Sequence, residues 1–311
     1  MRKEEFYYPS RDNQTQIHAV RWIPETEAPV CIVQIVHGMA EYAERYEDFA
    51  RFLTEHNILV TGEDHLGHGK SIRADKNPGY FCEQDPATVA VRDVHRLKKI
   101  TQEKYPGVPY IILGHSMGSF MTRDYISRYG NGINAAIIVG TGLQSELLLS
   151  VSTLVANIQR LFKGDNHISH FINKCGFGSY NDRIESPRTS KDWLTRDDAI
   201  VDAYLMDELC GFTFTVNGFR TLFELIRRTQ DNSNIKNIPD ELPMFFISGD
   251  ADPVGEYGKG VKEVVSMLEK AGKTNVEMKL YEDARHEIIN ELQRDSVYED
   301  IYEWINRIIS A

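Results

Sequence analysis

Short apolar segments rich in β-branched residues recur along the chain, and segments of helical spacing separate them. The apolar segments are CIVQIVHG from Cys31, ILVTGEDH from Ile58, YIILGHS from Tyr110, AAIIVG from Ala135 and MFFISGD from Met244. Strands that are apolar at nearly every position are typical of a parallel sheet covered by helices on both faces. The pattern therefore predicts an α/β fold, with residues 6–8 and 17–23 as antiparallel edge strands before the parallel part.

Other segments have the spacing of helices that pack on such a sheet. Residues 46–53 carry apolar side chains at helical intervals, and Asp85 followed by Pro86 is typical of an N-cap and a first helical turn. The chain closes with an apolar stripe at the helical period, formed by Val297, Ile301, Trp304, Ile305 and Ile308. Each of these segments predicts a helix against the core.

The strand pattern stops between about Leu143 and Asp240, where the sequence becomes helical and rich in aromatic residues. A stretch of about a hundred residues is too long for a structureless loop in a compact domain, but it suits a helical subdomain. We therefore predict a core formed by residues 1–142 and 241–311, and a helical cap, or lid, formed by residues 143–240.

The composition is that of a globular protein and restricts its partners. Of the 311 residues, 41% are hydrophobic and 26% are charged, and no apolar run approaches the roughly 20 residues of a membrane-spanning helix. The net charge of -11 argues against binding to nucleic acid and against electrostatic docking on anionic lipids, because both would repel the protein at long range. A neutral substrate is expected.

The cysteines and the N-terminal residues indicate a compartment. Cys31, Cys82, Cys175 and Cys210 are far apart and form no CxxC or CxxH cluster, so free thiols are expected rather than disulfides or a zinc site. The first residues, MRKEEFYYPS, lack the apolar stretch and cleavage site of a secretory signal. We expect a cytoplasmic protein.

The motif GHSMG contains the first candidate for chemistry, Ser116. It directly follows the apolar segment YIIL and precedes a segment with helical character, MGSFMTRDYISRYG. A serine on a sharp strand-to-helix turn needs small neighbours two residues away on either side, here Gly114 and Gly118, because the strained backbone lies close to adjacent strands. The alternative is a tight turn with an incidental serine, but this context favours Ser116 as a nucleophile.

A serine hydroxyl is a weak nucleophile near neutral pH, so it needs a base and an acid that orients this base. For a serine on this kind of turn, both follow downstream in the order acid, histidine. Asp252 in SGDADP follows the strand-like MFFI, and His286 in ARHE is the only histidine after it. Asp250, two residues before Asp252, is the alternative acid, with Asp252 then capping a turn.

The motif HGMAEY follows the apolar segment CIVQIV and brings its backbone beside the serine turn. Ester hydrolysis passes through an oxyanion that needs two preorganised donors, and the backbone N–H groups of Met39 and Met117 are the expected pair. His37 is interpreted as a residue that holds this loop by hydrogen bonding rather than as a catalyst.

The remaining candidates have simpler structural explanations. His65 and His68 in DHLGHG have a spacing seen in some metal sites, but the glycines favour a loop packed under the site, and no metal is expected. Glu41 and Arg45 are interpreted as a loop-stabilising pair. No GxGxxG or GxxxxGK[ST] motif occurs, so no nucleotide cofactor is expected.

Five motifs, HGMAEYAERY, EDHLGHGKS, GHSMG, SGDADP and ARHEIINE, resemble the monoacylglycerol lipase and lysophospholipase group of α/β-hydrolases. The resemblance covers nearly the whole chain, including the position of the cap. It implies an α/β-hydrolase fold with a mostly parallel eight-stranded sheet, and a triad of Ser116, Asp252 and His286 with the Met39 and Met117 amides as oxyanion hole.

One departure from the family pattern concerns the oxyanion loop. Where many monoacylglycerol lipases have HGxGEH, this chain has Ala40 and Tyr42. The amide of Met39 is retained, but the shape of the acyl and glycerol pocket is left open.

Apolar residues of the predicted cap are candidates for an acyl-chain channel, with Leu148, Phe212 and Phe214 as substrate-binding residues. The alternative is that these side chains form the internal core that joins cap and sheet. Movement of the cap as a gating lid, and transient contact of the cap with membranes, are further hypotheses. The oligomeric state is left open.

The main functional hypothesis is hydrolysis of a carboxylic ester, a monoacylglycerol or a lysophospholipid, through an acyl-enzyme on Ser116 and without a cofactor. A general carboxylesterase for shorter acyl chains is the second reading. Peptide hydrolysis is less supported, because nothing in the cap suggests an anchor for a free amino terminus. A ligand-binding or sensing role is a different class of function, against which the complete triad argues.

Overall fold

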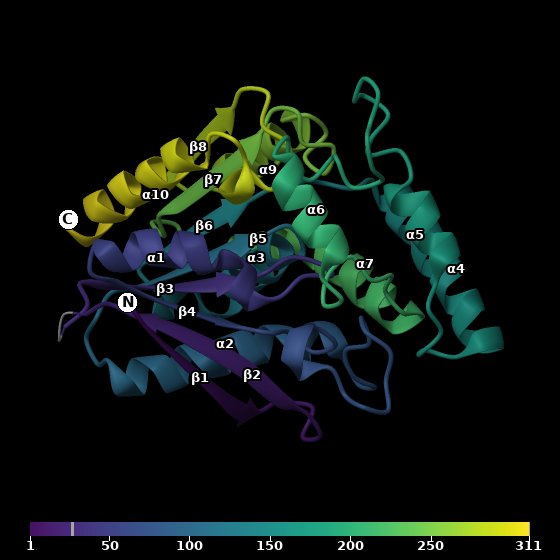
Figure 1. Cartoon of the computed structure of the whole chain (residues 1–311), viewed down its shortest axis with the longest axis horizontal. Helices are drawn as coiled ribbons and strands as arrows, with labels where there is room; N and C mark the ends of the chain where they lie inside the picture. The colour runs from purple at the N-terminus through teal and green to yellow at the C-terminus, as the bar shows by residue number, and fades with distance from the viewer. Residues whose placement is uncertain (26–27, 311) are drawn as a thin grey trace.

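The computed structural model of the protein describes residues 1–25 and 28–310. Among these residues, eight strands form one sheet with the order β1-β2-β4-β3-β5-β6-β7-β8 (Figure 1). They are β1 (Arg2–Pro9), β2 (Gln16–Ile23), β3 (Cys31–Val36), β4 (Ile58–Glu63), β5 (Tyr110–His115), β6 (Ala135–Val139), β7 (Met244–Gly249) and β8 (Val276–Tyr281). β2 runs antiparallel to β1 and β4, and all other neighbours are parallel. The predicted α/β fold and eight-stranded, mostly parallel sheet are confirmed.

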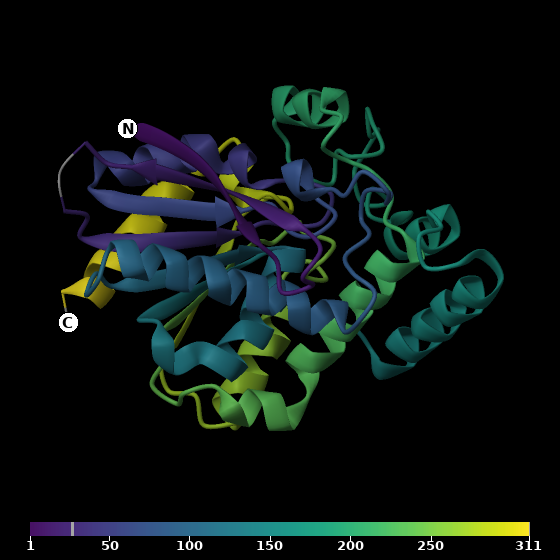
Figure 2. The same ribbon diagram turned by 90° about the horizontal axis from the view of Figure 1, so that it is seen from below.

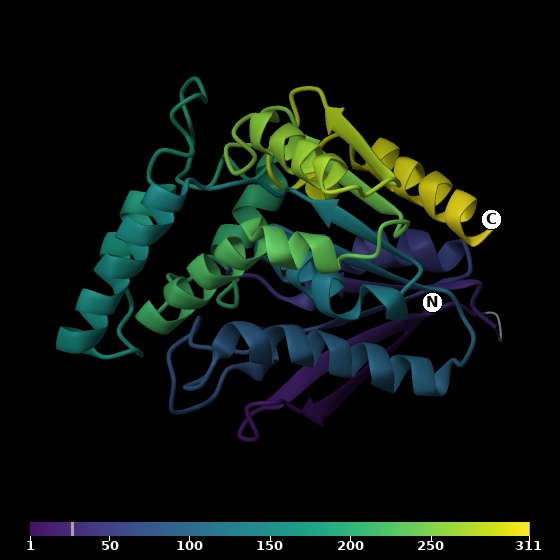
Figure 3. The same ribbon diagram turned by 180° about the vertical axis from the view of Figure 1, so that it is seen from behind.

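Helices cover both faces of this sheet (Figures 2 and 3). α2 (Pro86–Lys104), α3 (Met117–Tyr129) and α9 (Lys259–Lys270) contribute to the hydrophobic cluster on one face, and α1 (Glu47–Glu55) and α10 (Arg294–Ile309) to that on the other. Short 3-10 helices are η1 (Ala43–Tyr46), η2 (Gly69–Ser71), η3 (Gly130–Gly132) and η4 (Ile288–Asn290). Every residue of β3 to β7 is buried, which is why their sequences are almost continuously apolar.

The start of α2 differs in one detail from the sequence-based expectation. The helix begins at Pro86, as predicted, but Asp85 has a φ of 43° and its side chain makes no capping hydrogen bond. Its carboxylate instead accepts a hydrogen bond of 3.1 Å from Arg228. A tertiary contact therefore uses the carboxylate that local sequence reasoning assigned to the cap.

Between β6 and β7 the chain forms no strand and instead forms five helices. These are α4 (Glu146–Lys163), α5 (His170–Phe177), α6 (Asp198–Met206), α7 (Val216–Gln230) and α8 (Asn232–Asn237). The stretch of residues 143–240, which we call the cap segment, lies within this region. α7 and α8 pack on α3, whereas α4 and α5 lie at the outer end of the molecule (Figure 1).

The outermost helix, α4, has an exposed apolar face. Only Leu149 and Ala156 of this helix are buried. The exposed side chains on it are Leu147, Leu148, Val151, Leu154, Ile158, Leu161 and Phe162. In the described part of the chain, no helix combines the length and the apolarity that are needed to cross a membrane.

Candidate active site

Ser116 lies on a sharp turn between β5 and α3. It immediately precedes the helix and has φ 54° and ψ -120°, a conformation that L-residues rarely adopt. A Cβ at Gly118 would overlap the carbonyl oxygen of Val36, and one at Gly114 would overlap the backbone of Gly118. Glycine is therefore required on both sides of Ser116, as the strand–turn–helix interpretation of GHSMG predicts.

His286 and Asp252 form a buried pair at the same end of the sheet. The His286 Nδ1 lies 2.9 Å from the Asp252 Oδ2, and both side chains are almost fully buried. The other carboxylate oxygen of Asp252 accepts a hydrogen bond of 2.8 Å from the Val254 amide. Asp250, the alternative acid, is exposed and accepts a hydrogen bond of 2.7 Å from the Asp283 amide. The structure thus places Asp252, and not Asp250, beside the histidine.

Two glycines allow the loop after β8 to reach back across the strand ends. Gly249 ends β7, and a Cβ there would overlap the backbone of this loop. Gly140 follows β6 with a φ of 60°, and a Cβ there would lie 3.1 Å from the Cε1 of His286. The ring of His286 consequently lies with its centroid 4.8 Å from that of His115, the residue before Ser116.

The free ring nitrogen of His286 is the main chemical feature of the site. Its Nε2 is buried and has no hydrogen-bond partner among the described residues. Because Nδ1 faces the carboxylate of Asp252, Nε2 is left as the proton acceptor. His65 and His68 each also have one buried ring nitrogen without a partner, so such an atom does not by itself mark a site. His286 differs from them because its other nitrogen faces Asp252 and its ring lies against His115, the residue before Ser116.

The loop of the predicted oxyanion hole packs directly on the serine turn. A Cβ at Gly38 would lie 3.0 Å from the Cβ of Ser116, so the backbone at Met39 arrives next to the serine. Met117 is the first residue of α3, where backbone N–H groups have no acceptor within the helix. Ala40, which stands at the family's glycine position, has a φ of 55°. Alanine therefore adopts a conformation there that glycine adopts at lower cost.

A buried ionic network lies directly behind this loop. Arg45 donates hydrogen bonds to Glu41 at 2.6 Å and to both carboxylate oxygens of Glu287 at 2.9 and 2.8 Å. Glu41 also accepts a hydrogen bond of 2.5 Å from the Gly38 amide, and lies 3.2 Å from the Nδ1 of His115. The network thereby links the oxyanion loop, the serine turn and the histidine loop.

Electrostatics keep this network ionised. Burial opposes the charge on Glu41, but the hydrogen bond with His115 and the charge of Arg45 outweigh it and hold the pKa of Glu41 well below its usual value. Burial likewise disfavours a charged His115, but the Glu41 carboxylate raises the pKa of this histidine. Sequence reasoning predicted the Glu41–Arg45 pair but missed Glu287, which directly follows His286 yet is 242 residues from Arg45.

The histidines of the DHLGHG loop pack under the site. The ring of His65 stacks on that of His37 with a centroid distance of 3.8 Å, and the His65 amide donates a hydrogen bond of 3.0 Å to the Nε2 of His37. Burial lowers the pKa of His65 to about 4 and that of His68 to about 3. Neutral, hydrogen-bonded rings fit the predicted role of a packed loop.

A cluster that sequence reasoning did not single out has the donor set of a cation site. Glu5, His18 and Glu44 have ligand atoms within 4.8 Å of one another. The ammonium group of Lys70 lies 2.6 Å from Glu5 and 2.9 Å from Glu44. Lys3 also pairs with Glu44, so two lysines already balance the two carboxylates, and the cluster gives no reason to assign a metal.

The three predicted substrate-binding residues do not share one environment. Phe214 is fully buried and packs on Phe81 and Phe219 with centroid distances of 5.9 and 5.8 Å. Phe212 is half-buried, with its ring 5.3 Å from that of His68, and Leu148 lies on the exposed face of α4. Phe212 and Phe214 thus join cap segment and core around His68.

Sequence reasoning also missed the part of the cap segment that contacts the site. The ring of Trp193 lies 5.2 Å from that of His286, and the Glu287 amide donates a hydrogen bond of 2.7 Å to the carbonyl oxygen of Leu194. Tyr204 donates a hydrogen bond of 3.1 Å to the carbonyl oxygen of Ala40 in the oxyanion loop. No local sequence pattern marks these residues.

Known proteins with similar sequences include lipases. The chain is 27% identical over 288 residues to a monoacylglycerol lipase of Mycolicibacterium smegmatis, covering 91% of this chain and 90% of the relative. It is also 27% identical over 292 residues to the monoglyceride lipase of Homo sapiens, covering 92% of this chain and 85% of the relative.

Solved structures show the same fold. A thermostable carboxyl esterase from Bacillus coagulans, in complex with glycerol, superposes with a TM-score of 0.92 at 31% identity and covers 99% of both chains. The monoglyceride lipase of Saccharomyces cerevisiae has a TM-score of 0.77 at 17% identity, which supports the fold alone. The family model described as "Serine aminopeptidase, S33" matches residues 27–293. The predicted resemblance is therefore confirmed, and the chain belongs to this S33 family of α/β-hydrolases.

Proposed function

We propose that this α/β-hydrolase cleaves carboxylic esters, with monoacylglycerols or lysophospholipids as substrates, through an acyl-enzyme on Ser116. The observation that carries the proposal is the His286–Asp252 pair, whose free, buried Nε2 lies in the site that also contains the strained Ser116 turn. The lipase and esterase relatives support the class of serine ester hydrolase.

In the proposed mechanism, the Nε2 of His286 accepts the proton of Ser116 while its Oγ attacks the ester carbonyl carbon. The tetrahedral intermediate collapses, and the alcohol leaves with the proton from His286. His286 then takes a proton from water, whose oxygen attacks the acyl-enzyme. As this second tetrahedral intermediate collapses, His286 returns the proton to the Oγ of Ser116 and the fatty acid leaves. Asp252 holds the imidazole and stabilises its charged form.

The amides of Met39 and Met117 are the proposed donors to the oxyanion. Two backbone donors that are fixed before reaction need no reorganisation when charge develops on the carbonyl oxygen. Glu41 supports this arrangement, because it accepts a hydrogen bond from the Gly38 amide and so fixes the loop before Met39.

A lipid substrate is supported by the exposed apolar face of α4. Contiguous exposed apolar side chains on a peripheral helix are a feature of protein and membrane contact sites. We propose that residues 143–240 act as a cap over the site, and that α4 makes transient contact with lipid surfaces. The proposed cytoplasmic location agrees with four free cysteines, one of which, Cys175, is exposed.

A carboxylesterase for shorter acyl chains is the second candidate, favoured by the similarity to the Bacillus coagulans carboxyl esterase. Phe214 also supports it, because its full burial makes this side chain part of the core rather than of an open acyl channel.

Steady-state hydrolysis of p-nitrophenyl esters and monoacylglycerols of increasing acyl length, beside Ser116→Ala, tests these proposals. Activity that is highest on medium or long chains and lost in the variant is the expected result. A preference for short esters would favour the carboxylesterase. Ser119→Ala is a matched control, since Ser119 is a buried serine one turn further along α3. Equal activity of wild type and Ser116→Ala would refute the proposed nucleophile.

Two further readings are distinguished in the same experiment. Aminopeptidase activity, which the family description names, is measured with amino-acid p-nitroanilides. Negligible turnover on all esters together with tight binding of a fatty acid or monoacylglycerol would instead support a ligand-binding role.

A further inference from the structure

Arg123 is a buried arginine on the helix that carries the candidate nucleophile. It lies two turns after Ser116 on α3 and is only 5% exposed. None of the carboxylates in the described residues pairs with it, and its partners are all neutral oxygens. Burial lowers the pKa of its guanidinium. Burying a charge without a countercharge costs free energy, so the hydrogen bonds of this side chain must offset that cost.

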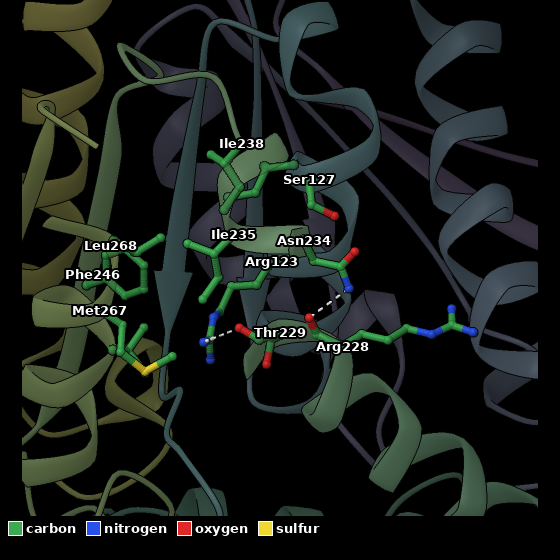
Figure 4. A pocket seen from close by; sticks show the side chains of 12 residues that line it. Arg123, Ser127, Arg228, Thr229, Asn234, Ile235, Ile238, Phe246, Met267 and Leu268 are labelled. Carbon is green, nitrogen blue, oxygen red and sulfur yellow. Dashed lines mark hydrogen bonds between the residues drawn. The ribbon is translucent and has the colours of Figure 1, made fainter. Parts of the chain in front are cut away.

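Its partners lie just before the cap segment and in the last turn of α7. Nη1 donates hydrogen bonds of 3.2 Å to the Oγ1 of Thr141 and 3.1 Å to the carbonyl oxygen of Gly142, just before α4. Nη2 donates a hydrogen bond of 3.2 Å to the carbonyl oxygen of Thr229 in the last turn of α7 (Figure 4). One side chain thus fastens to α3 both the residues that lead into the cap segment and the C-terminal end of α7.

A second contact joins these two ends directly. The amide of Gln144 donates a hydrogen bond of 2.8 Å to the side-chain oxygen of Gln230, and the side-chain nitrogen of Gln230 donates one of 2.8 Å to the carbonyl oxygen of Gln144. Arg123 therefore belongs to a compact junction at which the chain leaves the core and returns to it.

The same junction touches the acid–base pair. A Cβ at Gly140 would lie 3.1 Å from the Cε1 and 3.2 Å from the Nδ1 of His286. A Cβ at Gly142 would overlap the carbonyl oxygen of Val254, whose amide is bonded to Asp252. The segment that Arg123 clamps is therefore in contact with both the imidazole and the turn that holds its carboxylate.

We infer that Arg123 is a positioning residue. It clamps the residues before the cap segment and the end of α7 to the nucleophile helix, and thereby holds residues 140–142 against the His286–Asp252 pair. This inference rests on the proposed function. It predicts that the conformation of the cap segment and the orientation of the imidazole are mechanically coupled through Arg123.

Arg21 provides a matched control for the loss of a buried arginine. It is 4% exposed in β2, lies 3.7 Å from Glu4 and has its guanidinium 3.9 Å from the ring centre of Phe6. β2 is next to the sheet edge opposite β8, whereas β5 and β7, which precede Ser116 and Asp252, lie further along the sheet. Loss of Arg21 therefore reports destabilisation without the clamp.

The test compares Arg123→Met and Arg123→Lys with Arg21→Met and Arg21→Lys, using a short p-nitrophenyl ester. Arg123→Met is expected to lower kcat about tenfold or more with little change in KM, and Arg123→Lys to recover part of it. Arg21 variants should lose thermal stability but keep kcat and KM.

Hydrogen exchange of the Gln144 amide gives a readout that does not depend on turnover. Faster exchange is expected in both Arg123 variants and not in the Arg21 variants. If Arg123→Met does not fold, Arg123→Lys and Gln230→Leu carry the test. The inference is overturned if folded Arg123 variants keep the wild-type kcat and the wild-type exchange of the Gln144 amide. Failure of the proposed function looks different, because the wild-type protein would then be inactive on esters or Ser116→Ala would be active.

Discussion

Two helices of the cap segment, α4 and α7, differ sharply in how they are held. α4 has 18 residues and buries two of them, while α7 has 15 residues and buries nine. Asn217 of α7 accepts a hydrogen bond of 2.9 Å from the Phe81 amide and donates one of 2.8 Å to the carbonyl oxygen of Cys82. α7 is therefore mechanically part of the core, although its sequence groups it with the cap.

The cap segment therefore contains two regions with different roles. α7 packs on α3 and accepts the hydrogen bond from Arg123 near the His286–Asp252 pair. α4, at the start of the segment, exposes apolar side chains to solvent. Regions with few buried contacts open at low free-energy cost, so movement is expected at α4 and not at α7. Under the proposed function, the chemistry depends on the residues that α7 holds in place, and the access of substrate depends on α4.

The largest expected effect is a loss of kcat when Asp252 is changed. Asp252→Asn should lower kcat by about 10⁴-fold, because an amide in place of the carboxylate favours the wrong imidazole tautomer. Asp250→Asn is the matched control, since Asp250 is exposed and bonded to the Asp283 amide. Both variants should unfold near the wild-type temperature, measured by calorimetry. Equal losses of kcat in the two would contradict the assignment of Asp252.

A pair of phenylalanine variants measures how much α7 and α4 each contribute to stability. Phe219→Ala on α7 should cost about 3–5 kcal/mol of unfolding free energy, because this side chain is fully buried. Phe162→Ala on α4 should change stability by less than about 0.5 kcal/mol, because its side chain is 83% exposed. Urea unfolding followed by circular dichroism measures both. Similar costs at the two positions would mean that α4 is as firmly packed as α7.

Two buried carboxyl groups of the core, Glu63 and Asp93, should make the free energy of unfolding depend on pH. Burial raises the pKa of Glu63 to about 8, although Tyr8 donates a hydrogen bond to its carboxyl group, and burial with the nearby charge of Glu63 raises the pKa of Asp93 to about 8. A carboxyl whose pKa is higher when folded stabilises the protein at acid pH, and this contribution is lost as pH rises toward 8.

The expected slope from one such group is about 1.4 kcal/mol per pH unit between the unfolded and folded pKa values. Glu63→Gln should flatten the fall of unfolding free energy between pH 5 and 8, with Asp93 retaining part of it. The measurement is urea unfolding at each pH. An unchanged slope in Glu63→Gln would show that Glu63 is ionised in the folded protein.

The smallest expected effect is on binding of α4 to lipid surfaces. Phe162→Ser should leave kcat on a soluble short ester unchanged, but weaken binding to neutral phosphatidylcholine vesicles several-fold, because less apolar area is buried in lipid. Val30→Ser is the control, since Val30 is also exposed but precedes β3 at the opposite end of the strands. Vesicle sedimentation measures both, and equal binding of the two variants would argue against docking through α4.

The sequence alone determined the parts that depend on short-range geometry. The apolar segments marked the strands from β3 to β7, because strands buried on both faces carry almost no polar side chains. GHSMG marked the strained turn, because Gly114 and Gly118 have no room for a Cβ. The order of motifs along the chain was sufficient to predict the family.

Tertiary structure alone decided which residues meet across long sequence separations. It placed Asp252, and not Asp250, beside His286, and it paired Glu287 with Arg45. It also brought Trp193 against the ring of His286 and buried Arg123 between Gly142 and Thr229. It also placed Phe214, just before α7, in the interior and Leu148 of α4 in solvent, although both were predicted to bind substrate. A local pattern specifies how a segment is buried, but its partner depends on how the sheet order and loop crossings bring distant segments together.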